Sequence, residues 1–127
     1  MLAAADVSLI TLNVDAALSS MPSKIFNVMA SARPVLAIVP LESELARIVE
    51  DAGCGWSVPP GSSVELAVAI VQLFARECTF LIQMGQNGRA HLEKYYSRSH
   101  CVDAYEKMLI TMYDRIQWKS ADMEEVL

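Results

Sequence analysis

The stretch "SSMPSKIFNVMASARPVLAIVP", residues 19–40, joins a helix start to a strand and sets the fold. Pro22 suits the first position of a helix, where its missing N–H would have no helical partner. The helix is expected to end near Ala32, because Arg33 precedes a proline and such a residue is disfavoured in the α region. The apolar run Val35–Val39 then predicts a strand buried on both faces of a parallel sheet.

The same alternation of short apolar runs and amphipathic helices extends on both sides of this stretch. Val7–Leu12, "VSLITL", predicts a first strand covered on both faces, and residues 54–58, "CGWSV", predict a third strand. Between the second and third strands, Ser43 is a candidate N-cap and Gly53 a candidate C′ residue of an amphipathic crossover helix.

The rest of the chain predicts helices only. Ser62 and Glu65 form a capping-box pattern at the start of an apolar helix over residues 64–77, whose inner side is Leu66, Ala69, Ile70 and Leu73. Ser97 is a candidate cap for the last helix, and the tail after Trp118 is expected to be frayed.

Between these two helices, residues 79–95 predict another one, capped by Thr79. Gly85 and Gly88 lie inside it, and each disfavours a helix interior by about 1 kcal/mol relative to alanine. The two glycines therefore predict a bend or a break.

The order β-α-β-α-β-α-α-α predicts an α/β fold with parallel strands joined by right-handed crossovers. Doubly wound domains usually have more strands, arranged as two halves. The chain is therefore expected to contain one half, a partial Rossmann-like three-layer domain with a three-stranded parallel sheet plus C-terminal helices. Residues 1–118 are predicted to form this domain and residues 119–127 its frayed tail.

Composition places the chain among globular proteins. It has 127 residues, of which 54% are hydrophobic and 20% charged. The mean hydropathy is +0.31, yet no apolar run approaches the roughly 20 residues that span a bilayer. No signal-peptide pattern opens the sequence, so the cytoplasm is the expected location.

Charge and cysteine spacing exclude several kinds of partner. The net charge is −5 and the basic residues are scattered, which argues against nucleic acid. Cys54, Cys78 and Cys101 have no CxxC spacing and are interpreted as buried free thiols. His91 and His100 have no partners at ligand spacing, so no metal is expected. No cofactor is predicted either.

Pro22, Ser23 and Lys24 have two interpretations. A helix start at the carboxyl edge of a parallel sheet, with a hydroxyl and an ammonium beside its N–H groups, can bind a small anion such as phosphate. The same residues are also ordinary for a capped helix start with a solvated lysine. Spacing alone leaves both open.

Four segments together resemble a known family. "ADVSLITL", "PSKIFNVMASARPVLA", "ELARIVEDAGCGWSVPPGS" and "MGQNGRAHLEKYYS" are similar, in order and spacing, to the C-terminal half of the nucleotide-sugar-binding domain of family 4 glycosyltransferases. These enzymes have the GT-B architecture of two facing Rossmann-like domains. The resemblance covers about residues 3–113 and is closest to members with a "PSK…GRPVLA" signature, which build exopolysaccharide or lipopolysaccharide sugars.

The resemblance implies a nucleoside-diphosphate sugar as donor. Its diphosphate would meet the helix start, and its ribose would lie near the second helical turn. The implied substrate-binding residues are Ser20, Met21, Pro22, Ser23, Lys24 and Asn27. The family's two glutamates here are replaced by Ser19 and Asn27, so Asn27 offers an amide to a ribose hydroxyl instead of a carboxylate. The family's glycine before "RPV" is Ala32, which is strained if the turn needs a left-handed residue.

The same resemblance implies a retaining transfer in which Lys24 stabilises charge on the departing diphosphate and no residue of this chain is catalytic. The acceptor-binding domain and half of the donor domain would be missing, so the chain alone is expected to be inactive. In its full-length context it would be cytoplasmic, and relatives often dock peripherally on the inner membrane.

The expected partner is therefore the missing N-terminal part of the enzyme or a separate chain. An open sheet edge along Val7–Leu12 also predicts self-association. A second hypothesis is a non-catalytic binding or assembly module that completes its sheet with a partner subunit. A phosphate-binding response module is disfavoured, because only Asp6 and Asp15 lie near the first strand.

Overall fold

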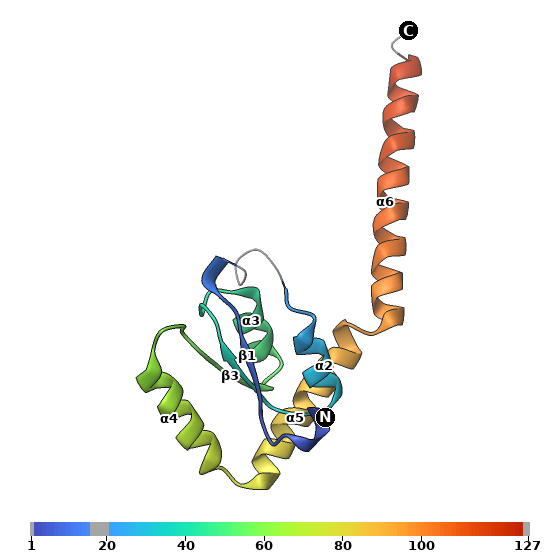
Figure 1. Cartoon of the computed structure of the whole chain (residues 1–127). Coiled ribbons are helices and arrows are strands. Elements are labelled where there is room, and N and C mark those ends of the chain that lie inside the picture. The colour runs from blue at the N-terminus through green and yellow to red at the C-terminus, as the bar shows by residue number, and fades with distance from the viewer. Residues whose placement is uncertain (1, 16–20, 126–127) are drawn as a thin grey trace. The chain divides into compact units, whose positions relative to one another are not determined.

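The computed structural model describes residues 2–15 and 21–125 (Figure 1). The chain divides into two compact units, Met1–Glu93 and Lys94–Leu127. The helices and strands in chain order are η1 (Leu2–Ala4), β1 (Ser8–Thr11), α2 (Lys24–Ala30), β2 (Val35–Ile38), α3 (Glu44–Asp51), β3 (Gly55–Val58), α4 (Ser63–Phe74), α5 (Cys78–Tyr95) and α6 (Arg98–Glu125).

The three strands form one parallel sheet in the order β1-β2-β3. Leu9 of β1 is in register with Leu36 of β2, which is in register with Trp56 of β3. α2 connects the first pair of strands and α3 the second pair. The predicted fold class is confirmed, since the first unit is an α/β domain with the sheet of a partial Rossmann-like fold.

The two faces of the sheet are covered unequally. One face carries Ile10, Val35 and Ala37, all buried, and packs against α2 and α3. On the other face Leu36 and Val58 form a cluster with Ala69 and Leu73 of α4, and Leu66 packs against it. The inner side predicted for α4 is thus confirmed for three residues but wrong for Ile70, which is 51% exposed. Figure 1 shows α4 on one side of the strands and α2 and α3 on the other.

This second face, the α4 face, is incomplete beside β1. Leu9 points to it and keeps 50% of its surface exposed, and the burial of β1 alternates along the strand. The prediction of a first strand covered on both faces is therefore wrong. α4 makes its main sheet contact with β3, and Leu9 of β1 stays half-exposed on the α4 face.

Most predicted caps are confirmed. The Ser43 hydroxyl accepts a hydrogen bond from Ala46 N at 3.2 Å, and Gly53 has a φ of +55° just after the end of α3. At the start of α4 the Ser62 hydroxyl accepts from Glu65 N at 3.4 Å. Before α6, Ser97 accepts from His100 N at 3.3 Å.

The predicted cap of α5 at Thr79 and the predicted bend or break within this helix are both wrong. The helix begins at Cys78, before Thr79, and it continues without a break through both glycines to Tyr95. A Cβ at Gly85 would overlap the backbone carbonyl of Ala32, and a Cβ at Gly88 would come within 2.8 Å of the Cβ of Cys54. The glycines are therefore sites of close approach, which offset their unfavourable helix propensity by packing.

The start of α2 also differs from the sequence-based expectation. α2 begins at Lys24 with Ser23 as its N-cap, so Pro22 precedes the helix instead of opening it. α6 continues to Glu125, beyond Trp118. The division of the chain at residue 118 and the fraying of residues 119–127 stay predictions.

We expect Gly85→Ala to lower the free energy of unfolding by about 1–3 kcal/mol, because the added methyl group overlaps the Ala32 carbonyl and the helix has to shift. Urea denaturation measures this change. Gln86→Ala, at an exposed position one residue further along α5, serves as the control and should change the unfolding free energy by less than about 0.5 kcal/mol. Equal effects of the two substitutions would contradict the close-packing role of Gly85.

Candidate functional site

The start of α2 lies at the carboxyl edge of the sheet, because α2 follows β1 and leads to the next parallel strand. Open α/β sheets bind ligands at this edge. Of the residues predicted to contact a ligand, Met21 and Pro22 are half-buried and Ser23, Lys24 and Asn27 are exposed. Ser20 lies outside the described residues, as does Ser19.

Ser23 occupies the N-cap position without acting as a side-chain cap. Its backbone is in the right-handed helical region, with φ −57° and ψ −20°, and its hydroxyl makes no capping hydrogen bond. Ile25 N donates to Pro22 O at 3.2 Å and Phe26 N donates to Ser23 O at 3.1 Å. Two amides of the first turn are thus engaged within the chain, which leaves the Ser23 hydroxyl and the Lys24 ammonium as the main polar groups that this helix start offers.

The polar side chains of α2 lie on one side of the helix, and the side chains that contact the core lie on the other. Lys24 and Asn27 are three residues apart and therefore lie on one side of the helix, where both are exposed. Ile25, Val28 and Met29 have no exposed surface and anchor the opposite side in the core. The buried side fixes the helix, and the exposed side presents an ammonium and an amide together.

α5 holds the other end of α2 in place. Arg89 Nη1 donates to the carbonyl of Ala30 at 3.4 Å, which puts a cation at the negative end of α2. Gly85 of α5 packs directly against the Ala32 carbonyl. Sequence reasoning missed this contact, although two glycines three residues apart on one helix are the signal of a close approach.

Ala32 adopts a left-handed backbone conformation with a φ of +52°. It is the one non-glycine residue with a positive φ in the described chain, and this conformation disfavours a residue with a Cβ by roughly 1–2 kcal/mol. The strain expected from the replacement of glycine at this turn is therefore confirmed. The turn sets how α2 leads into β2.

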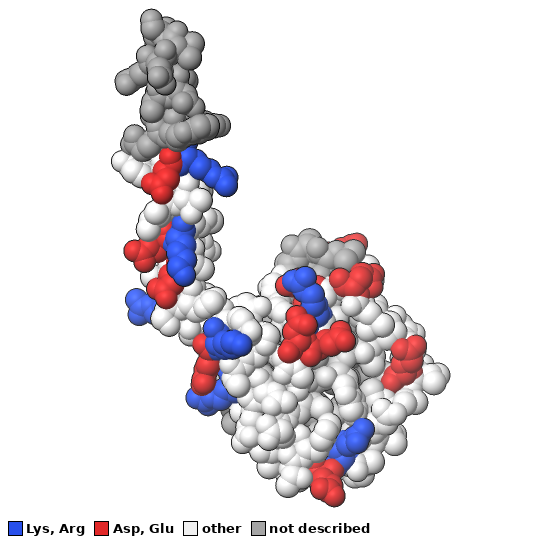
Figure 2. All heavy atoms as spheres, turned by 180° about the vertical axis from the view of Figure 1, so that it is seen from behind, with Lys and Arg blue, Asp and Glu red and all other residues white. Residues whose placement is uncertain are grey.

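Charged side chains are dispersed over the surface. On the described atoms of the face in Figure 2, Lys and Arg stand singly or beside acidic side chains, without a continuous basic stripe. Examples are the exposed ion pairs Glu44–Arg47 at 2.6 Å and Arg89–Glu93 at 2.9 Å. Within residues 2–15 and 21–125, no group of three or more His, Cys, Asp or Glu residues is arranged to hold a metal ion.

The three cysteines are free thiols with different surroundings. Cys54 is buried, as predicted, whereas Cys78 is exposed and Cys101 is half-buried, so the prediction of three buried thiols is wrong for these two. Burial raises the pKa of the Cys54 thiol from its ordinary value of 9.0 to about 11, although a backbone hydrogen bond acts in the opposite direction. Cys54 is therefore an unreactive core residue at neutral pH.

A half of a doubly wound α/β sheet with an exposed polar helix start is a common scaffold for binding phosphate-containing ligands. No protein-family model matches the chain, and no solved structure matches it. None of the described helices is both long enough and apolar enough to cross a bilayer.

One curated protein is similar in sequence to the chain. Over 96 residues the chain is 35% identical to the probable glycosyltransferase WbjE of Pseudomonas aeruginosa. The match covers 76% of this chain but only 23% of that protein. The chain is thus similar in sequence to part of a probable glycosyltransferase, and it corresponds to less than a quarter of that relative's length.

We expect Ala32→Gly to raise the free energy of unfolding by about 0.5–1 kcal/mol, because glycine accepts the left-handed conformation at lower energy. The same change at Ala30, which is helical, should lower it by up to about 1 kcal/mol. Thermal or urea unfolding of both variants tests the pair. Destabilisation by Ala32→Gly would mean that the turn is not strained.

The raised pKa of Cys54 predicts a pH dependence of stability. Between about pH 9 and 11 the folded chain keeps the Cys54 proton while the unfolded chain releases it, so the unfolding free energy falls as pH rises. Cys54→Ala should give a flatter profile than the parent chain in this range. Identical slopes for the parent and Cys54→Ala would exclude this contribution.

Proposed function

We propose that the chain is the donor-binding half-site of a retaining, sugar-nucleotide-dependent glycosyltransferase of family 4, with the GT-B architecture. The observation that carries this proposal is the sequence similarity to a probable glycosyltransferase. It is supported by the exposed polar side of α2 at the carboxyl edge of a parallel sheet. The proposed ligand is a nucleoside-diphosphate sugar.

The diphosphate of the donor would lie against the start of α2. The Lys24 ammonium would pair with a phosphate oxygen, and the Ser23 hydroxyl, which is not used as a cap, would donate to another. Ser20, Met21 and Pro22 would border the same anion. Because the whole chain has a net charge of −5, its overall field repels anions and these local groups have to supply the attraction.

Asn27 would contact the ribose. It lies one turn further along α2 from Ser23 and on the same exposed side. Its side-chain amide can both donate to and accept from a hydroxyl group, but it lacks the charge that strengthens a carboxylate contact. A weaker ribose contact than that of a glutamate follows from this difference.

Lys24 would act electrostatically during transfer. As the bond between the sugar and the diphosphate breaks, negative charge grows on the diphosphate, and a fixed ammonium stabilises it more in the transition state than in the ground state. No residue of this chain is proposed as nucleophile, acid or base. Acceptor-binding groups would come from outside the chain, so we expect it to transfer no sugar alone.

NMR titration of the 15N-labelled chain with inorganic pyrophosphate, and then with UDP, GDP, ADP and CDP, tests the proposed site. We expect shifts centred on the amides of residues 21–27. Lys24→Ala should weaken binding about tenfold, the effect of losing one charge-assisted contact of about 1.4 kcal/mol. Lys24→Arg should bind more tightly than Lys24→Ala, because it keeps the positive charge.

Lys94→Ala is the matched control, since Lys94 is also exposed but lies in the second unit. We expect it to bind each ligand as the parent chain does. Equal weakening by Lys24→Ala and Lys94→Ala, or shifts confined to other residues, would remove Lys24 from the proposed donor site.

A further inference from the structure

α4 has an apolar outer side that faces away from the sheet. Ala69 and Leu73 hold its inner side in the core. Val64, Val68 and Val71 stay 73%, 50% and 65% exposed. Because they follow one another at intervals of four and three residues, they lie on one side of the helix. These three residues form the valine ridge.

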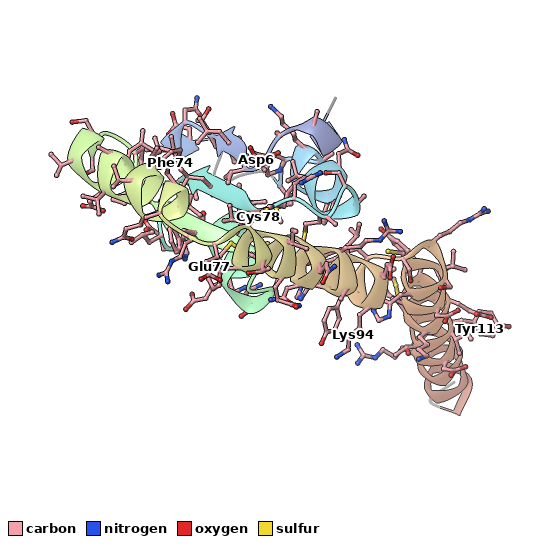
Figure 3. All side chains as sticks on the ribbon, turned by 90° about the horizontal axis from the view of Figure 1, so that it is seen from below. Asp6, Phe74, Glu77, Cys78, Lys94 and Tyr113 are labelled. Atoms are coloured by element: carbon pink, nitrogen blue, oxygen red, sulfur yellow. The ribbon has the colours of Figure 1, made fainter. Side chains whose placement is uncertain are left out.

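The valine ridge is separate from the part of α4 that faces β1. Ile70 and Phe74 line a groove on that side together with Asp6 and Cys78, and Figure 3 labels Phe74, Asp6 and Cys78 around it. The three valines do not line this groove. Structure added beside β1 would therefore cover the groove and leave the ridge exposed.

A second groove lies next to the ridge, between α4 and β3. It has a volume of about 370 Å³. Trp56 and Val58 of β3 line one side, and Val64 and Val68 of α4 line the other. In the described part of the chain β3 is an outer strand of the sheet and pairs with β2 alone. An apolar ridge and an apolar groove thus lie side by side on one surface.

This combination suits a second copy of the chain. In a twofold-symmetric interface the same patch occurs on both subunits, so the patch has to be complementary to itself. The ridge of one copy would enter the groove of the other, and symmetry would supply the reverse contact. A helix of 12 residues is only about 18 Å long, so such an interface is at the small end of the known range and would dissociate on dilution.

The charges at the two ends of α4 favour an antiparallel pair. Among the described residues that line the groove, Glu65 near the helix start is alone in being charged. Arg76 follows the other end of the helix, and its guanidinium lies 5.8 Å from the ring centroid of Trp56, which also lines the groove. Glu65 and Arg76 are eleven residues apart, about three helical turns, and therefore lie on the same side of α4.

An antiparallel arrangement about a twofold axis would bring Glu65 of each copy towards Arg76 of the other. Opposite charges would then meet at both ends of the interface. A parallel arrangement would instead place the two Glu65 side chains next to each other, where like charges repel.

We propose that two copies of the chain associate through the valine ridge and the groove between α4 and β3, with their α4 helices antiparallel and Glu65 of each copy paired with Arg76 of the other. α2 packs on the opposite face of the sheet from α4 (Figure 1). Ser23 and Lys24 therefore stay exposed in both copies, and the association does not depend on the proposed donor site.

A lipid surface is the other apolar partner that could cover the ridge. Helices that lie in a membrane interface are usually rich in Lys and Arg on their polar side, but α4 has neither between Ser63 and Phe74. The net charge of −5 also disfavours contact with anionic lipids. A second copy fits the composition of this surface better than a bilayer does.

Sedimentation equilibrium of the full chain across micromolar concentrations tests the proposal, with a reductant present because Cys78 is an exposed thiol. We expect a monomer–dimer equilibrium that Val68→Lys weakens at least tenfold, because an ammonium group would be buried in the groove. Ile82→Lys is the matched control and should change the affinity less than twofold. Ile82 is 48% exposed, close to the 50% of Val68, but it does not line the groove. Circular dichroism checks that each variant is folded.

Charge reversal provides a second measurement. Glu65→Arg and Arg76→Glu should each weaken the dimer about fivefold, and the double variant should return its affinity to within about twofold of the parent chain, because the ion pair is restored in the reverse sense. Failure of the double variant to recover would contradict the antiparallel pairing.

Three further outcomes would overturn the proposal. One is a chain that stays monomeric at all concentrations. Another is a dimer that Leu9→Lys dissociates and Val68→Lys does not, which would assign the association to the edge of β1. The third is binding of the monomer to phosphatidylcholine vesicles that Val68→Lys abolishes, which would assign the ridge to a bilayer. These measurements use no nucleotide, so their result is independent of donor binding.

Discussion

The close approach of α5 to the turn between α2 and β2 is the constraint on which the rest of the first unit depends. Gly85 lets the α5 backbone meet the Ala32 carbonyl, and Arg89 holds the last carbonyl of α2 from the same helix. Because α2 is only seven residues long, its position comes from these contacts and its buried side rather than from its own helical stability. The same contacts therefore fix the position of the polar residues at the start of α2.

The sequence predicts the elements well where one residue has one physical role. Ser43, Ser62 and Ser97 act at helix starts, where a hydroxyl satisfies a backbone amide, and the apolar runs around Ile10 and Val35 become parallel strands. It fails where the role depends on a distant partner. In the sequence, a glycine inside a helix indicates only a weak helix propensity. The structure of the turn at Ala32 is needed to show that Gly85 is a site of close packing.

Some features of the candidate site could likewise be predicted from the sequence, and others could not. The exposure of Lys24 follows from a local pattern, since a charged residue at a helix start is visible in the chain. The strain at Ala32 was expected only from the resemblance to a family that has glycine at this turn. The engaged amides of Ile25 and Phe26 are not visible there, because they depend on where the first turn tightens. The open side of β1 was likewise hidden, since Leu9 reads as a core residue whether or not a helix covers it.

The exposed thiol of Cys78 affects how any association of this chain is interpreted. Surface thiolates react with oxidants and can join two molecules through an intermolecular disulfide, which needs no contact between their sheets. In aerated buffer without a reductant, covalent pairs of this kind would imitate an edge-to-edge dimer in any mass measurement. Cys54, buried and held as a neutral thiol, would take no part in that oxidation.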